Sequence, residues 1–338
     1  MPGTLTPRGV IKALLRGEAP NRPLLMPIIF SLGSRLENLP LRDFQSNPTK
    51  IANALRQIRS VLKVDGLAGY FDPFLEAEAL GCKVNWLPEG LRLVPPPFSG
   101  LDDLRQKLAS PESVSQKGRI RVVCDVLQRL KTMLKDEPAL MVRVTGPFTL
   151  AAQLTGSSLE DMQPAIEAME FSAEVTATVA KQFVSAGADV VFITEDSLPQ
   201  LSAVFCEHWM ALLEPVINMI RFYDALPALH LGNTVQTSER LAVLLNCNWN
   251  CVLSGRFSVG QAEAWASKGI HWGVALPAEM FLGSQGAPEN SIGSLRGKLL
   301  EQRPVFLTSE EDIPPTADLK QVAAALQWLR GVCAAAFG

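Results

Sequence analysis

The chain has 338 residues, of which 47% are hydrophobic and 19% are charged, and its formal net charge is −3. This length suits one large domain of barrel size or two ordinary domains. The small net charge and the absence of any Lys/Arg run argue against a nucleic-acid partner. The sequence contains no run of about 18 apolar residues, so no membrane span is predicted. The segment Met1–Arg22 lacks the apolar core of a signal peptide, so a cytoplasmic location is expected.

Short apolar runs alternate with segments of helical periodicity along the chain. The first helix is expected to begin at Thr6, which can cap it, and to stop at Gly17. Eight later runs are short, apolar and bounded by turn residues or helices, so each is expected to be a buried strand. They are Leu24–Phe30, Gly66–Phe71, Leu140–Val144, Ala188–Thr194, Leu226–Leu229, Asn250–Leu253, Ile270–Val274 and Pro304–Thr308.

Helical segments are expected between these strands, with a hairpin-like excursion from Cys82 to Pro97. About eight strand–helix units in one chain favour an α/β fold of the (β/α)8 TIM-barrel type over an open doubly wound sheet. No Gly-x-Gly-x-x-Gly follows the first strand, which argues against a dinucleotide-binding fold. The expected helices are Pro48–Leu62, Phe74–Gly81, Leu101–Leu108, Val122–Leu134, Leu159–Ala186, Phe205–Phe222, Ser238–Leu245, Val259–Ser267, Leu295–Leu300 and Asp318–Val332.

Polar residues follow several of the predicted strands. The carboxyl ends of the strands of a barrel meet at one face, where active sites lie. Asp72, Asp196 and His230 stand at three such ends and are the expected catalytic residues, and Glu195 and the stretch 308–311 stand at the same face. Helix capping is the alternative role for each single acid. A structural histidine at a strand end is the alternative for His230, but the convergence of these residues favours a functional site.

Six segments, in order, resemble the uroporphyrinogen decarboxylase superfamily, which includes cobalamin-dependent methyltransferases that pass a methyl group between a corrinoid and a thiol. The resemblance covers essentially the whole chain. It implies a single barrel domain over residues 1–338 with an N-terminal helical extension, and it implies that Gly146 and Asn233 bind the cofactor. The six segments are Thr6–Pro23, Asp72 with Glu76–Gly81, Thr145–Leu150, Ala186–Asp189 with Asp196, His230 with Gly232–Thr234, and Thr308–Pro315.

The segment after the first predicted strand departs from the decarboxylases of this superfamily. Those enzymes place arginines there to hold the carboxylates of a porphyrinogen, whereas Arg35 is the only basic residue of Met26–Arg35. A tetrapyrrole with eight carboxylates needs several cationic partners to offset its desolvation. The resemblance is therefore to the methyltransferase branch. It implies a small-molecule methyl donor or acceptor and a corrinoid carried by a partner protein, because this chain has no Asp-x-His-x-x-Gly signature.

The methyltransferase branch holds zinc through one histidine and two cysteines. His230 matches the histidine, but Leu231 runs directly into Gly232 where the branch has a cysteine, and Glu311 stands where it has the second cysteine. Two outcomes stay open. One is a harder zinc site formed by His230, Glu311 and an acid such as Glu195 or Asp196, which would suit an ether or alcohol oxygen. The other is no metal, with His230 and the carboxylates in acid–base catalysis.

Two alternatives to methyl transfer also stay open. The first is a decarboxylase of porphyrinogen-like substrates, in which Asp72 stabilises a pyrrole cation. The second is a catalytically degenerate barrel that serves as a binding subunit, since both family thiolates are missing. The superfamily includes dimers, so a homodimer is an open expectation for the assembly.

Overall fold

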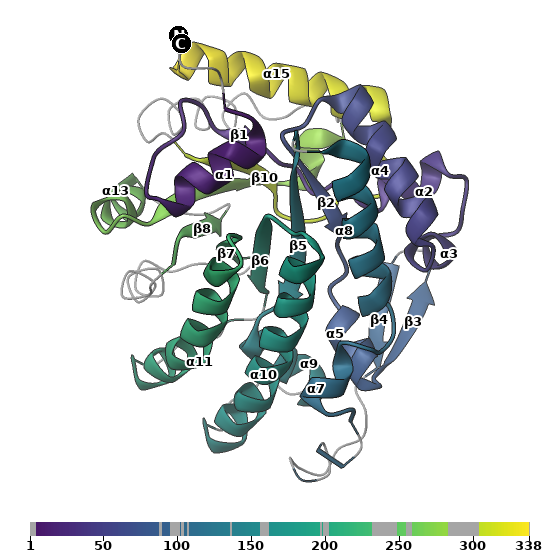
Figure 1. The fold of residues 1–338 in the computed structure, drawn as a ribbon, viewed down its shortest axis with the longest axis vertical. Coiled ribbons are helices and arrows are strands. Elements are labelled where there is room, and N and C mark those ends of the chain that lie inside the picture. Colours follow the sequence, from purple (N-terminus) through teal and green to yellow (C-terminus); the bar gives the residue numbers. More distant parts are fainter. Residues whose placement is uncertain are drawn as a thin grey trace.

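The computed structural model describes residues 5–87, 90–94, 102, 105–106, 108–135, 137–155, 162–196, 198, 203–231, 249–254, 259–282 and 304–337. In this part of the chain, eight parallel strands form one sheet in the order β1-β10-β9-β8-β7-β6-β5-β2. Figure 1 shows these strands at the centre of the molecule with helices around them. They are β1 (Leu24–Leu25), β2 (Gly66–Tyr70), β5 (Ala139–Thr145), β6 (Val190–Glu195), β7 (Leu226–Leu231), β8 (Cys251–Ser254), β9 (His271–Leu276) and β10 (Phe306–Ser309).

Helices follow the strands and cover the outer face of the sheet. In Figure 1, α4, α8, α10 and α11 lie along the outside of β2, β5, β6 and β7. The strands β3 (Lys83–Leu87) and β4 (Gly90–Val94) form the separate antiparallel hairpin expected after Cys82. The helices are α1 (Pro7–Leu15), α2 (Leu32–Leu36), α3 (Leu41–Gln45), α4 (Pro48–Leu62), α5 (Leu75–Leu80), α7 (Pro111–Val114), α8 (Ile120–Leu134), α9 (Pro147–Thr155), α10 (Met162–Ala186), α11 (Ala203–Phe222), α13 (Val259–Ser267), the 3-10 helix η1 (Ala278–Phe281) and α15 (Leu319–Phe337).

The two end strands of the sheet are joined through Asp65, which stands just before β2. Its backbone N–H donates to the Leu25 carbonyl at 2.9 Å, and its carboxylate accepts from the Leu25 N–H at 2.8 Å. Arg22 donates to both oxygens of the same carboxylate, at 2.7 and 2.9 Å. The ring of strands is therefore nearly closed. All residues of β2, β5, β6, β7, β8 and β10 are buried, as the apolar runs predicted, and the TIM-barrel fold is confirmed.

The first strand is shorter than the predicted Leu24–Phe30. Pro27 has no N–H to give to a neighbouring strand, so pairing stops after β1. The N–H of Ile28 donates instead to the Ser309 hydroxyl at 2.9 Å, and the N–H groups of Phe30 and Ser31 donate to the Asp312 carboxylate. This segment leaves the sheet and becomes part of the barrel mouth.

The predicted helices Ser238–Leu245 and Leu295–Leu300 lie outside the described residues, and Leu101–Leu108 is described only in part. Five short helices of the described residues were not predicted: α2 and α3 before the second strand, α7 before α8, α9 directly after β5, and η1 after β9. Among the helices that the structure describes, none combines the length and the apolar character needed to cross a membrane.

Candidate active site

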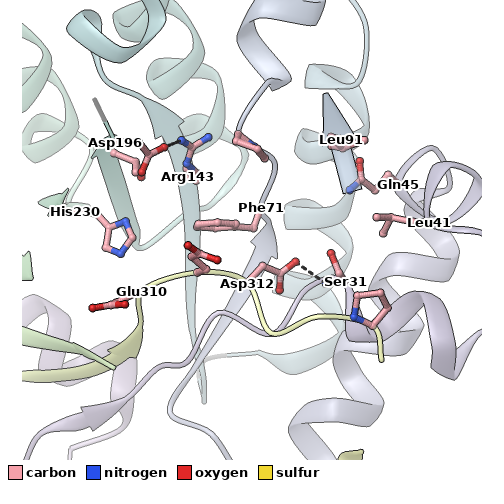
Figure 2. Close-up of a pocket in the computed structure, with 14 residues that line it drawn as sticks. Ser31, Leu41, Gln45, Phe71, Leu91, Arg143, Asp196, His230, Glu310 and Asp312 are labelled. Carbon is pink, nitrogen blue, oxygen red and sulfur yellow. Dashed lines mark hydrogen bonds and ion pairs between the residues drawn. The ribbon is translucent and has the colours of Figure 1, made fainter. Parts of the chain in front are cut away.

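A cavity of about 470 Å³ opens at the carboxyl ends of the barrel strands. Figure 2 shows polar side chains from distant parts of the chain facing this common space. Four carboxyl side chains, one guanidinium and one imidazole line it, together with smaller polar and apolar groups. The lining residues are Ser31, Leu41, Gln45, Phe71, Pro73, Leu91, Arg143, Thr194, Asp196, His230, Glu310, Glu311, Asp312 and Pro315.

The alternation of side chains along β6 decides which of its polar residues reach the cavity. Thr194 and Asp196 line it, whereas Glu195 between them does not. Successive side chains of a strand point to opposite faces of the sheet. Two adjacent acids at a strand end therefore cannot both face the interior of a barrel, and the structure places Asp196 inside.

His230 occupies the interior face of β7, in register with Thr194. Only 1% of its surface is exposed, and its ring stacks on Phe192 with centroids 5.5 Å apart. Neither ring nitrogen has a hydrogen-bond partner among the described residues; the nearby Ser309 backbone falls outside hydrogen-bond geometry. Burial lowers the pKa of His230 to about 4, against the opposing pull of Asp196. The imidazole is therefore neutral at pH 7 and can both donate and accept one hydrogen bond.

We expect the imidazole of His230 to titrate with a midpoint near pH 4 in an NMR titration, the resonance being assigned by its loss in His230→Gln. Because the pKa of the folded state lies below the ordinary value, the unfolded chain binds the extra proton first. The contribution of His230 to stability is thus present above about pH 6.5 and is lost as the pH falls towards 4. A midpoint between pH 6 and 7 would contradict the assigned burial.

Arg143 stands on the interior face of β5 and is the single cation among the described residues that line the cavity. It donates to the Asp196 carboxylate at 2.6 Å and to the backbone carbonyl of Asp72 at 2.9 Å. Its guanidinium lies 5.6 Å from the centre of the Phe71 ring, and Figure 2 shows the ring beside it. These contacts hold Arg143 and Asp196 as a fixed, internally neutralised pair on one wall.

Asp72 lies behind this wall rather than on the cavity surface. Its fully buried side chain forms an ion pair with Arg119, which also donates to Gln45 and, at 2.7 Å, to Glu78. The other carboxylate oxygen of Asp72 accepts from the Phe74 N–H at 2.8 Å, which is an Asx-turn. The sequence predicts a catalytic role for Asp72. In the structure its side chain pairs with Arg119 and its carbonyl accepts from Arg143, so its described contacts are those of a positioning residue.

Glu195 and Gly146 meet on the outside of the barrel. The Glu195 carboxylate accepts from the N–H groups of Phe148 and Thr149 at 3.2 and 2.8 Å, and from the indole of Trp209 at 2.8 Å. It thus supplies acceptors for the first N–H groups of α9. A Cβ atom at Gly146 would lie 2.3 Å from the Glu195 carboxyl carbon. Both residues are occupied in packing α9, and neither reaches the cavity where cofactor or metal binding was expected.

The loop after β10 supplies three of the four cavity acids. Glu310 and Glu311 both line the cavity, and in Figure 2 Glu310 lies on the same side of it as His230. Asp312 accepts from the N–H groups of Phe30 and Ser31, just before α2, at 2.8 and 2.9 Å. Burial raises the pKa of Asp312 to about 7. Its carboxyl group is therefore only partly charged at neutral pH.

The donor set for a metal is incomplete in the described part of the chain. Of the expected zinc ligands, His230, Glu311 and the alternative third ligand Asp196 line the cavity, whereas Glu195 does not. No three His, Cys, Asp or Glu side chains among the described residues are placed to hold a metal ion together. These residues do not fit a three-ligand zinc site. Asn233, expected to bind the cofactor, lies outside the described residues.

The sequence interpretation missed Arg143. The available signal was a single arginine inside an otherwise apolar strand, because a charged side chain is rarely buried without a partner. Thr194 was also missed, and there the alternation along the strand was the signal. Arg119 carries no local signal, since its partners lie far away in the sequence.

A comparison of the sequence with known protein families identifies the family of this chain. The sequence matches the family described as Uroporphyrinogen decarboxylase (URO-D) over residues 6–331. The chain belongs to this family. The expected resemblance is thereby confirmed. In TIM-barrel enzymes the active site lies at the carboxyl ends of the strands, which is where the cavity described above opens.

One curated protein and two solved structures are similar to this chain. A methylated-thiol–coenzyme M methyltransferase of Methanosarcina mazei is 26% identical over 156 residues, which are 46% of this chain and 38% of that protein. The solved structure of a methyltransferase from Methanosarcina mazei aligns with a TM-score of 0.77 at 17% identity, covering 96% of this chain and 99% of that one. A B12-independent methionine synthase from a Shewanella species aligns with a TM-score of 0.57 at 14% identity, covering 88% and 92%. The alignments to these two structures show a common fold.

Proposed function

We propose that this protein moves a methyl group between a small molecule bound in the cavity and a corrinoid carried by a partner protein. Family membership and the similarity to a methylated-thiol–coenzyme M methyltransferase support methyl transfer. The observation that carries the proposal is His230, a buried neutral imidazole without partners among the described residues, on the wall of a cavity at the strand ends. Reacting groups are bound at this position in TIM-barrel enzymes.

The lining of the cavity argues against a porphyrinogen substrate. Among the described lining residues, Arg143 is the single cation, and it is already paired with Asp196. A substrate with many carboxylates would meet three further acids and no free cation there. Asp72, which a decarboxylase would need beside the pyrrole, is paired with Arg119 behind the wall.

A degenerate scaffold is also less well supported. A barrel without a ligand gains nothing from a buried histidine that lacks hydrogen-bond partners among the described residues, since each unsatisfied polar group costs about 1–3 kcal/mol. The Thr194 hydroxyl is a third polar atom of the same cavity wall that has no partner among the described residues. Unsatisfied groups that line a cavity are typical of a binding site.

The chain itself orients the methyl-bearing molecule and limits its contact with water. His230 can donate one hydrogen bond and accept another, so it can hold the heteroatom to which the methyl group is attached. The Arg143–Asp196 pair, on the neighbouring strands β5 and β6, and the Phe71 ring form a fixed part of the wall beside it. A reduced corrinoid, when bound, supplies a nucleophilic cobalt that accepts the methyl group.

The test uses free cob(I)alamin in place of the partner-held corrinoid and follows its visible spectrum with methanol, methyl phenyl ether, dimethyl sulfide and N-methylated ammonium ions as donors. We expect faster methylation in the presence of the protein for at least one donor. His230→Gln is expected to lower that rate by about 100-fold, the usual effect of removing one hydrogen-bonding group aimed at the reacting atoms.

His271→Gln is the matched control for this test. His271 lies on β9, and its ring is within 3.2 Å of the Leu14 carbonyl, away from the cavity. Its replacement is expected to leave the rate within about twofold of the original. The absence of any spectral change across all donors would contradict the proposed function and favour the scaffold.

Zinc, a homodimer and a cytoplasmic location stay predictions of the sequence. Metal analysis of the purified protein tests the first of these. One equivalent of zinc that is lost in both His230→Ala and Glu311→Ala would support the site, even though the described donor set does not complete it.

A further inference from the structure

Two buried polar side chains lie next to each other in the cavity wall. Thr194 of β6 is in register with His230 of β7, and each residue is 1% exposed. Residues in register on neighbouring parallel strands point to the same face of the sheet, and such strands lie about 4.8 Å apart. Both side chains line the cavity, and Figure 2 shows the imidazole of His230 facing it. The hydroxyl and the ring therefore border the same small volume.

In the described part of the chain, no group satisfies the hydrogen-bonding atoms of this pair. The Thr194 hydroxyl and both ring nitrogens of His230 are buried without a hydrogen-bond partner there. Arg143, in the same wall, is already engaged, because it donates to the Asp196 carboxylate and to the Asp72 carbonyl. A buried polar atom without a partner costs stability, so such atoms at the surface of a cavity are expected to meet a ligand.

The pair can offer two hydrogen-bond donors to a single atom. A threonine hydroxyl donates one hydrogen bond, and an imidazole donates at least one in either of its protonation states. Two donors that each lie about 2.9 Å from a common acceptor are roughly 4–5.5 Å apart, which suits side chains on neighbouring strands. The ring of His230 is stacked on Phe192, so its plane is held in place.

We propose that Thr194 acts with His230 as a two-donor site that binds the heteroatom of the methyl donor, and that this atom is a neutral oxygen or sulfur. The inference deepens the proposed function and rests on it. The oxygen or sulfur of an ether, alcohol or thioether has lone pairs that accept both hydrogen bonds. The nitrogen of a protonated or quaternary amine has no lone pair, so it would leave both donors unsatisfied.

The breaking of the methyl bond is the step in which two donors matter most. The bond from the methyl carbon to the heteroatom breaks with its electron pair staying on the heteroatom. The methyl carbon forms its new bond with an electron pair of the nucleophile, which in the proposed function is a reduced corrinoid. The oxygen or sulfur thus gains a negative charge, and it takes a proton from water after release. Fixed donors aimed at this atom bind it more strongly in the transition state than in the substrate.

The first part of the test measures binding and needs no corrinoid. Methyl phenyl ether and ethylbenzene have nearly the same shape, but only the ether carries an oxygen that can accept hydrogen bonds. In a ligand-observed NMR titration we expect the ether to bind about 10-fold more tightly, as two modest hydrogen bonds would give. Thr194→Val keeps the branched shape without the hydroxyl and is expected to remove most of this preference, whereas Thr194→Ser is expected to keep it.

The second part measures the rate at which free cob(I)alamin is methylated. Thr194→Val is expected to lower this rate about 100-fold with methyl phenyl ether, the usual effect of losing one donor aimed at a developing anion. The loss is expected to be less than about 10-fold with methyl 4-cyanophenyl ether, because the cyano group already stabilises the departing oxygen. A residue that only packs the cavity wall would affect both donors alike.

Thermal unfolding of the ligand-free protein separates binding from packing. Because the Thr194 hydroxyl has no partner among the described residues, its removal in Thr194→Val is not expected to lower the melting temperature. Ser172→Ala is the matched control. Ser172, in α10, is fully buried, and its hydroxyl also lacks a partner in the described structure, but it does not line the cavity. This variant is expected to keep the ether preference and to keep both rates within about twofold.

Four results would overturn the inference. They are equal affinities for the ether and ethylbenzene, no binding of either probe, a preference that survives in Thr194→Val, and a melting temperature that this variant lowers by more than about 3 °C. An ether preference that depends on Thr194, without methyl transfer from any donor, would keep the two-donor site and remove the proposed function. Methyl transfer at a rate that Thr194→Val leaves unchanged would do the reverse.

Discussion

Replacing Arg119 with methionine is expected to lower the free energy of unfolding by about 3–5 kcal/mol, the usual cost of removing one partner of a buried ion pair. The Asp72 side chain is fully buried and the Arg119 side chain is 8% exposed. Without the guanidinium, the buried Asp72 side chain loses its ion-pair partner. Glu78 and Gln45 lose the same donor.

Denaturation by urea at pH 7 measures this effect, and Arg121→Met is its matched control. Arg121 is the second residue of α8 and is exposed to solvent, so its loss is expected to cost no more than about 0.5 kcal/mol. Asp72→Asn in the Arg119→Met background is expected to restore part of the stability, because it removes the unpaired charge. Equal effects at Arg119 and Arg121 would show that the ion pair is not buried as described.

Alanine at Gly146 is expected to destabilise the protein by about 3 kcal/mol, at the upper end of the usual range for overpacking. The new Cβ would lie 2.3 Å from the Glu195 carboxyl carbon, well inside contact distance. Glu195 cannot move aside cheaply, because two N–H groups of α9 and the indole of Trp209 hold its carboxylate. Its displacement would leave three buried donors without acceptors.

A double-mutant cycle with Glu195→Ala separates this clash from a general effect of the substitution. We expect Gly146→Ala to cost at least about 1 kcal/mol less in the Glu195→Ala background, since the atom it strikes is gone. Gly331→Ala is the control: a Cβ there meets nothing within 4 Å, and Gly331 lies inside α15. That change is expected to stabilise the helix by about 0.5–1 kcal/mol. Strict additivity at Gly146 and Glu195 would contradict the packing described here.

Much of the fold followed from local patterns. Each of the eight predicted strands exists, and the helix Pro48–Leu62 has the predicted bounds. Long apolar runs such as β5 can be recognised because a buried parallel strand is covered on both faces. The length of the first strand was overestimated, because Pro27 ends its pairing. The N–H groups of Phe30 and Ser31 donate to Asp312, far along the chain, and not to a neighbouring strand.

The candidate site was recognised in part. His230 and Asp196 were predicted at the barrel mouth and both line the cavity there, as does Glu311. Glu195, Gly146 and Asp72 were expected in the same space and lie outside it. For Glu195 the alternation of side chains along β6 was enough to decide. For Gly146 and Asp72 the deciding partners, Glu195 and Arg119, come from other elements.

The sequence alone determined the class of the fold, the order of its strands and helices, and the face at which a site would form. These depend on hydrophobic periodicity and on chain direction, which are local properties. Only the tertiary structure decided which charges are paired. Arg143 meets Asp196 across 53 residues of chain and Arg119 meets Asp72 across 47. Such pairs depend on the register between distant strands and helices, so no local pattern shows which acids are neutralised and which are left facing the cavity.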